Sequence, residues 1–276
     1  MRDSYLKQRE PSKPWTFFAL SFAFSWVVWG AVLAVPMPES LLLPVIILGA
    51  FGPTFAAVFL VQASSDKETR GDFWNRVLSL KRIGWRWYLF IFLFFPAIYL
   101  LGYYVYSFFG GSQPPVESLF SGLETPADAL IFALIMILGG PVAEELGWRG
   151  YVLDPLQEKW GALKGSAILG FFWICWHLPL FFIEGTSQHA KGFGFQFWSW
   201  SFQLVFLSIV FTWVYNNTNR SILAAVLLHL MANMAYPVNL EPVGEAIFTV
   251  IRLLIVLAIA FAWRQKPSVK KQLIRA

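Results

Sequence analysis

The sequence of 276 residues is 57% hydrophobic and 18% aromatic, carries only 13% charged residues, and has a mean hydropathy of +0.58. Ordinary globular domains contain about 25% charged residues, so this composition excludes a typical soluble domain and predicts an integral membrane protein. The net charge of +5 does not indicate a nucleic-acid partner, because the basic residues are confined to the tails and to short loops between apolar runs, where membrane orientation accounts for them.

Eight apolar segments approach the roughly 20 residues that a helix needs to cross a bilayer core of about 30 Å. Their apolar runs are continuous, which favours helices over the alternating strands of a barrel. The sequence therefore predicts an all-α, polytopic membrane protein of about eight transmembrane helices, with residues 1–276 forming a single integral membrane domain. In chain order, the predicted spans are residues 15–35, 41–63, 85–109, 128–146, 165–183, 196–215, 221–236 and 243–263.

The charges of the loops predict the orientation of these spans. If the spans alternate in direction, all but two of the 21 Lys and Arg residues, Lys191 and Arg252, lie on one side. By the positive-inside rule that side is cytoplasmic and both termini face the cytoplasm, in a bacterial-type plasma membrane. The longest cytoplasmic segment between spans, residues 64–84, is predicted to lie on the membrane interface. Its apolar residues are Phe73, Trp74, Val77, Leu78 and Leu80.

The fourth predicted span ends in the stretch GGPVAEELGWRG, residues 139–150, which places two adjacent carboxylates at membrane depth. An ionisable residue there costs a few kcal/mol and is a candidate functional residue. Residues four apart share a face of a helix, so Glu145 is predicted to pair with Arg149. Glu144 lies about 100° away around the axis and points elsewhere. We therefore expect the two glutamates to have different roles.

Two further spans carry polar residues. The fifth contains His177, and the seventh contains His229 and Asn233, which share a helix face because they are four apart. A single histidine on an apolar face is usually a satisfied core residue, but two on different helices, one with an asparagine beside it, favour a shared site. Counting about 1.5 Å per residue puts His177 roughly 20 Å and His229 roughly 13 Å from the cytoplasmic flanks. Breaks or kinks are therefore predicted at residues 139–141 and at Pro179.

Together, Glu144, His177, His229 and Asn233 suit the activation of a water molecule for hydrolysis. A desolvated glutamate can act as a general base, and neutral histidines accept a proton, hold the water or bind a metal. The set Glu144, His177 and His229 also matches a catalytic zinc site with an open water position, although the H-E-x-x-H signature is absent. No serine or cysteine lies in an evident triad, so an activated water is favoured over a covalent mechanism.

The stretches EELGWR, WICWH and HLMAN resemble, in this order, the three motifs of the CPBP family of intramembrane proteases. That family includes the type II CAAX prenyl endopeptidases and the bacteriocin-processing or bacteriocin-immunity proteins. The motifs lie within residues 144–233. The resemblance implies an eight-helix fold with a buried polar site open toward the cytoplasm, and hydrolysis of a peptide bond in a membrane-associated protein or peptide, such as a prenylated CAAX-type protein.

The resemblance also implies roles for individual residues. Glu144 would activate water with the help of His177, while His229 and Asn233 would hold the oxyanion or complete a metal site. The family is usually labelled metalloprotease, which implies one divalent metal, zinc above all, although a metal-independent glutamate mechanism also fits. Supporting roles fall to Glu145, Arg149 and Trp173. The last of these departs from the family's usual phenylalanine but keeps an aromatic wall.

Two other classes of function stay open. In an ion or proton-coupled transporter, Glu144, His177 and His229 would relay protons or bind a cation; inverted repeats, which favour this class, are not visible in the sequence. In a non-catalytic scaffold or bacteriocin-immunity protein, the motifs would serve only the structure. For the protease, the expected partners are membrane lipid and a peptide or protein substrate, without nucleic acid; oligomeric state is not predicted.

Overall fold

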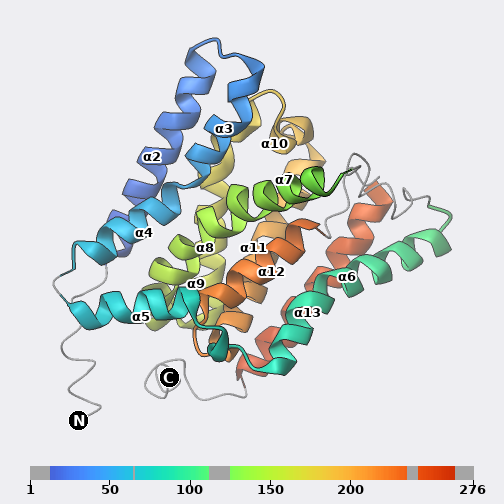
Figure 1. The fold of residues 1–276 in the computed structure, drawn as a ribbon. Coiled ribbons are helices and arrows are strands. Elements are labelled where there is room, and N and C mark those ends of the chain that lie inside the picture. Colours follow the sequence, from blue (N-terminus) through green and yellow to red (C-terminus); the bar gives the residue numbers. More distant parts are fainter. Residues whose placement is uncertain (1–12, 65, 112–124, 235–241, 265–276) are drawn as a thin grey trace.

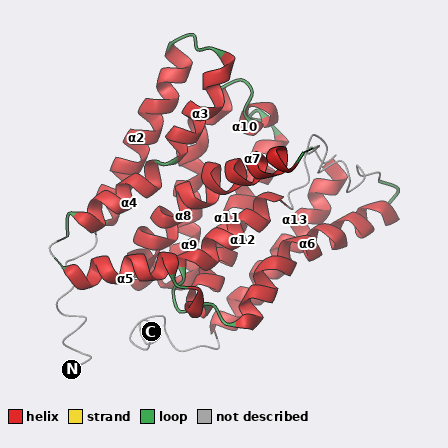
Figure 2. Ribbon diagram, viewed as in Figure 1, coloured by secondary structure: helices red, strands yellow, loops and turns green. Residues whose placement is uncertain are grey.

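The computed structural model describes residues 13–64, 66–111, 125–234 and 242–264. Within these ranges every regular element is a helix (Figure 2), which confirms the predicted all-α class. Residues 1–12 and 265–276, which carry many of the basic residues used to predict the orientation, lie outside the described residues. The end of the seventh predicted span, residues 235 and 236, lies outside them as well.

Four helices coincide with predicted spans to within two residues. They are α2 (Pro14–Ala34), α6 (Trp85–Phe108), α11 (Phe195–Asn217) and α13 (Pro242–Arg264). By length and composition, five helices of the described chain can cross a membrane, or up to six if a bent pair forms one span. Several apolar spans are therefore present, as expected for an integral membrane protein. The predicted number of eight is not reached by this criterion, because two predicted spans belong to one helical run and a third is short.

The second predicted span consists of two helices, α3 (Glu39–Ala50) and α4 (Gly52–Gln62), bent by 41°. Gly52 lies at this bend, where a Cβ atom would come within 2.1 Å of the Ser25 hydroxyl oxygen on α2. Pro53 follows in the first turn of α4, where its missing N–H costs nothing. The bend thus lets α4 pack closely against α2.

From Pro126 to Phe182 the chain is almost continuously helical. The helix α7 (Pro126–Ile137) leads into a π-helical turn, η3 (Leu138–Val142), at the predicted break. The short α8 (Ala143–Gly147) is followed by a second π-helical turn, η4 (Trp148–Val152). The fourth predicted span therefore ends too early at residue 146: the chain stays helical beyond it, and the side chain of Arg149, counted among the loop charges, is fully buried.

The helix α9 (Leu153–His177) continues from the second π-helical turn and bends at Gly161, whose φ of 77° suits glycine. It ends at His177, and a 3₁₀ turn, η5 (Leu178–Phe182), begins around Pro179, in agreement with the break predicted there. The short α10 (Ser187–Lys191) precedes α11. The seventh predicted span is α12 (Ile222–Met234), only 13 residues long. In the bundle (Figure 1), α11 packs against α9 and α13, and α12 packs against α6 and α11.

The predicted interfacial segment forms α5 (Lys67–Leu78), along the lower edge of the bundle in Figure 1, and a 3₁₀ turn, η1 (Leu80–Arg82). Asp66 caps α5 by accepting hydrogen bonds from the N–H groups of Glu68 and Thr69. Leu78 and Leu80 are exposed, as an interfacial role requires, but Phe73 is only 1% exposed and belongs to the hydrophobic core. The prediction was therefore wrong for Phe73.

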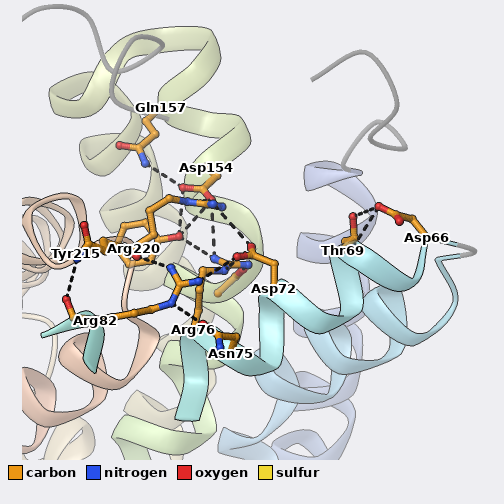
Figure 3. Close-up of polar contacts among 12 residues, drawn as sticks. Asp66, Thr69, Asp72, Asn75, Arg76, Arg82, Asp154, Gln157, Tyr215 and Arg220 are labelled. Atoms are coloured by element: carbon orange, nitrogen blue, oxygen red, sulfur yellow. Dashed lines mark hydrogen bonds and ion pairs between the residues drawn. The ribbon is translucent and has the colours of Figure 1, made fainter. Parts of the chain in front are cut away.

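A cluster of charged residues fastens α5 to the bundle (Figure 3). Arg76 donates to the Tyr215 hydroxyl oxygen at 2.8 Å and to the Gly150 carbonyl oxygen at 3.1 Å. Arg220 forms an ion pair with Asp154 on α9. Burial opposes the charge of Arg220, but the carboxylate of Asp154 outweighs it and raises the pKa of Arg220. We call this group the Asp154 cluster; it consists of Asp72, Arg76, Arg82, Asp154, Tyr215 and Arg220.

Candidate active site

The short helix α8 carries the first of the three motif stretches and buries both of its carboxylates, with Glu144 only 5% and Glu145 0% exposed. Arg149 Nη1 lies 2.8 and 2.9 Å from the two carboxylate oxygens of Glu145, which confirms the pairing predicted from their spacing. The guanidinium of Arg149 also lies 4.9 Å from the ring centroid of Trp173 and 4.8 Å from that of Phe211. Ring faces attract a cation, so these contacts stabilise the buried charge.

Glu145 makes a second contact that the sequence did not predict. Its Oε1 atom lies 2.8 Å from Nδ1 of His229 on α12. A carboxylate accepts hydrogen bonds, so Nδ1 donates and the orientation of the imidazole is fixed. Nε2 of His229 consequently faces away from Glu145.

Polar atoms from α8 and α12 converge beside Gly140, in the π-helical turn before α8. A Cβ atom on Gly140 would lie 3.1 Å from Asn233 Nδ2, 3.6 Å from His229 Nε2 and 3.7 Å from Glu144 Oε1. The three atoms therefore border the same small space beside Gly140, where an added side chain would crowd Asn233. Asn233 is exposed while Glu144 and His229 are buried, so the group extends from the protein interior to its surface.

His177 joins this group indirectly. Its Nδ1 atom donates to the Trp173 carbonyl oxygen at 2.8 Å; since a carbonyl only accepts, Nδ1 carries the proton and Nε2 is the acceptor of the neutral ring. The Trp173 ring lies 6.2 Å from that of His177 and 5.5 Å from that of His229, between ring centroids. Among the described contacts, His177 makes no hydrogen bond to Glu144, His229 or Asn233. The structure thus brings three of the four candidate residues together and connects the fourth through Trp173.

Two indole groups contact Glu144. The N–H of Trp173 donates to Glu144 Oε2, and the N–H of Trp148 lies 3.3 Å from the same oxygen. Sequence reasoning missed Trp148 altogether. The signal was available, since Trp148 is four residues after Glu144 and so shares its helix face, but no role was assigned to this indole.

In the described structure, the side chains of the proposed metal ligands Glu144, His177 and His229 are not arranged around one shared metal ion. In residues 13–64, 66–111, 125–234 and 242–264, no three or more His, Cys, Asp or Glu side chains form a group that could hold a metal. Nδ1 of each histidine is engaged, which leaves both Nε2 atoms available, but among the described contacts His177 reaches Glu144 and His229 only through Trp173. We therefore derive no chemical step through a metal.

Comparison with known proteins gives two matches. The sequence model of the family described as "Type II CAAX prenyl endopeptidase Rce1-like" matches residues 126–235, a range that contains all three motif stretches. The protein named "CAAX prenyl protease 2" of Methanococcus maripaludis is 30% identical over 227 residues, which cover 80% of this chain and 83% of that relative.

Proposed function

Because this chain belongs to the family of type II CAAX prenyl endopeptidases, we propose that it is an intramembrane endopeptidase. Its substrate would be a prenylated, membrane-associated protein or peptide, cut at a peptide bond near the C-terminus. The name of the M. maripaludis relative supports a protease that acts on CAAX proteins. The observation that carries the proposal is the convergence of Glu144, His229 and Asn233 on the space beside Gly140.

In the proposed reaction, a water molecule in that space donates a proton to Glu144 Oε1 as its oxygen attacks the scissile carbonyl carbon. The buried carboxylate is placed to act as the general base. When the C–N bond breaks, the proton passes from Glu144 to the leaving amine nitrogen. No covalent intermediate with the protein is needed.

The negative charge that develops on the carbonyl oxygen needs hydrogen-bond donors. Asn233 Nδ2 borders the space and donates to this oxyanion. His229 turns Nε2 toward the same space because Glu145 holds Nδ1, and donates alongside Asn233 when Nε2 is protonated. His177 lies beside Trp173 and assists from there, since its Nε2 atom can accept a proton or a hydrogen bond.

We further propose that the chain crosses the membrane eight times, with both termini in the cytoplasm and the site open to that side. The loop charges support this orientation, and the exposure of Asn233 is compatible with an open site. Reaction of single cysteines, introduced in place of Lys81 and Gln188 in a Cys175→Ala background, with an impermeant thiol reagent tests it. Only the cysteine at 81 should be protected in intact cells.

The activity is tested with the purified full chain in liposomes and a peptide that ends in a farnesylated Cys-a-a-X sequence. Mass spectrometry of the products should show release of a C-terminal fragment, and the unprenylated peptide should be cleaved more slowly. The His177→Ala and His229→Ala variants should lose activity. If the wild-type protein releases no fragment, or if both variants cleave at the wild-type rate, the proposal is wrong.

A further inference from the structure

Trp173 contacts three of the four proposed catalytic residues, each through a different part of the residue. Its indole N–H donates to Glu144 Oε2, and its ring packs edge-on against His229 at 5.5 Å between centroids. Its carbonyl oxygen accepts from His177 Nδ1 at 2.8 Å. Trp173 is 2% exposed, so the indole is enclosed by the group that it touches.

The two carboxylate oxygens of Glu144 have different surroundings. Oε2 receives both indole N–H groups, from Trp148 and Trp173. Oε1 lies on the side of Gly140, with His229 Nε2 and Asn233 Nδ2 around the same point. An indole N–H is a donor only, so these two bonds fix the plane of the carboxylate and leave Oε1 as the oxygen that faces the proposed water.

The indole of Trp173 is itself held in place. The guanidinium of Arg149 lies over its ring at 4.9 Å and over the ring of Phe211 at 4.8 Å. Arg149 is in turn fixed by its ion pair with Glu145. A donor held this firmly is already oriented before the substrate binds, which is the condition under which a polar contact contributes most to catalysis.

We propose that Trp173 is a positioning residue of the reaction: its indole N–H holds Glu144 Oε2, so that Oε1 is aimed at the water. This inference rests on the proposed function. Phenylalanine, usual at this place in the related motif, has no N–H, so the hydrogen bond is a feature of this chain. Without it, Glu144 can rotate, and fewer bound complexes hold the carboxylate in a reactive orientation. The turnover rate kcat should therefore fall, while KM should change little.

The test replaces Trp173 with 3-benzothienylalanine, which keeps the shape of the ring but has sulfur in place of the N–H, and separately with phenylalanine. The matched control is the 3-benzothienylalanine substitution at Trp176, one turn along α9. That indole is 1% exposed and donates to the Ser25 hydroxyl oxygen at 2.7 Å instead of to Glu144. Each full-length protein is assayed in liposomes with the farnesylated peptide.

We expect kcat to fall by about 10- to 100-fold in both Trp173 variants, the factor that corresponds to a lost hydrogen bond to a charged group. The fold-decrease in kcat of the Trp176 control should be at least about five times smaller than that of the Trp173 variants. Equal losses at the two positions, or a kcat of the Trp173 variants close to that of the wild type, would overturn the inference. The Glu144→Gln protein in the same assay separates this inference from the proposed function. If the inference is overturned but Glu144→Gln is inactive, the proposed function still stands. A fully active Glu144→Gln protein contradicts the proposed function itself.

Discussion

Glu145 Oε1 lies 2.8 Å from His229 Nδ1, so the partner of Arg149 also orients a histidine of the proposed catalytic group. The contact joins α8 to α12, the two helices that supply the polar atoms around Gly140. The role of Glu145 is therefore wider than the helix-end ion pair expected from its spacing.

Glu145→Gln is expected to lower kcat by about 10- to 100-fold with little change in KM, because His229 loses its charged acceptor. It should also lower the thermal unfolding temperature, since the fully buried Arg149 then loses the carboxylate with which it forms its ion pair. Steady-state cleavage and thermal unfolding of the same preparation measure the two effects. If kcat and the unfolding temperature were both unchanged, the contacts of Glu145 would contribute neither to catalysis nor to stability.

The space beside Gly140 can be filled by a single methyl group. In Gly140→Ala the added Cβ would lie 3.1 Å from Asn233 Nδ2 and within 4 Å of His229 and Glu144, so it crowds the space proposed for the water. We expect kcat/KM to fall at least about tenfold. The fold should persist, because alanine is more favourable than glycine within a helix by up to about 1 kcal/mol.

Gly139→Ala is the matched control for this experiment. Its Cβ would meet only Ile47, at 3.6 and 4.0 Å, which is ordinary van der Waals contact. Cleavage by the Gly139→Ala protein should stay near the wild-type rate. Equal activity of the two alanine variants would mean that the space at Gly140 is not where the reaction takes place.

The Asp154 cluster lies outside the candidate active site, and we expect substitution of Asp154 to lower the stability of the protein. Asp154→Asn removes one of the two carboxylates that Arg76 and Arg220 share, the other being Asp72; removal of one partner of a buried pair costs up to about 3–5 kcal/mol. Thermal unfolding should shift downward, and amide hydrogen exchange should increase in α5, which the cluster holds against the bundle. The exposed Glu68 on the same helix provides the control: Glu68→Gln should change stability by no more than about 0.5 kcal/mol. Similar shifts in both variants would contradict this account.

Metal depletion tests the proposed ligand set. Since Glu144, His177 and His229 do not form a metal-holding group in the described residues, we expect cleavage to continue after dialysis against a strong chelator, with metal content followed by elemental analysis. Loss of activity on depletion, and its recovery when zinc is added back, would show that these side chains rearrange around a metal during the reaction.

Hydropathy predicted the apolar helices well because the bilayer imposes a length on each continuous apolar run. The bounds of α2, α6, α11 and α13 follow from it to within two residues. The end of the fourth span was predicted too early, at residue 146, because a basic residue such as Arg149 after an apolar run is typical of a loop. Its charge is instead neutralised by Glu145 and by two ring faces inside the protein, and these contacts depend on the tertiary structure.

Helical spacing was sufficient for contacts within one helix. It predicted the pairing of Glu145 with Arg149 and the shared face of His229 and Asn233. Contacts between helices lay beyond it, because they depend on how far each helix is rotated and displaced. The bond between Glu145 and His229 is one example, and the indole of Trp173 on Glu144 is another. Both depend on the segment around α8, where π-helical turns on either side interrupt the regular period.

Glu144 is the proposed base that activates the water, and the initial rate of cleavage by the Glu144→Gln protein tests this role. Glutamine keeps the shape of the side chain and an oxygen acceptor for the two indoles but cannot take up the proton. In liposomes with the farnesylated peptide, the rate should fall about 100- to 10,000-fold below that of the wild type, the usual contribution of a general base. A Glu144→Gln protein that cleaves at the wild-type rate would contradict the account.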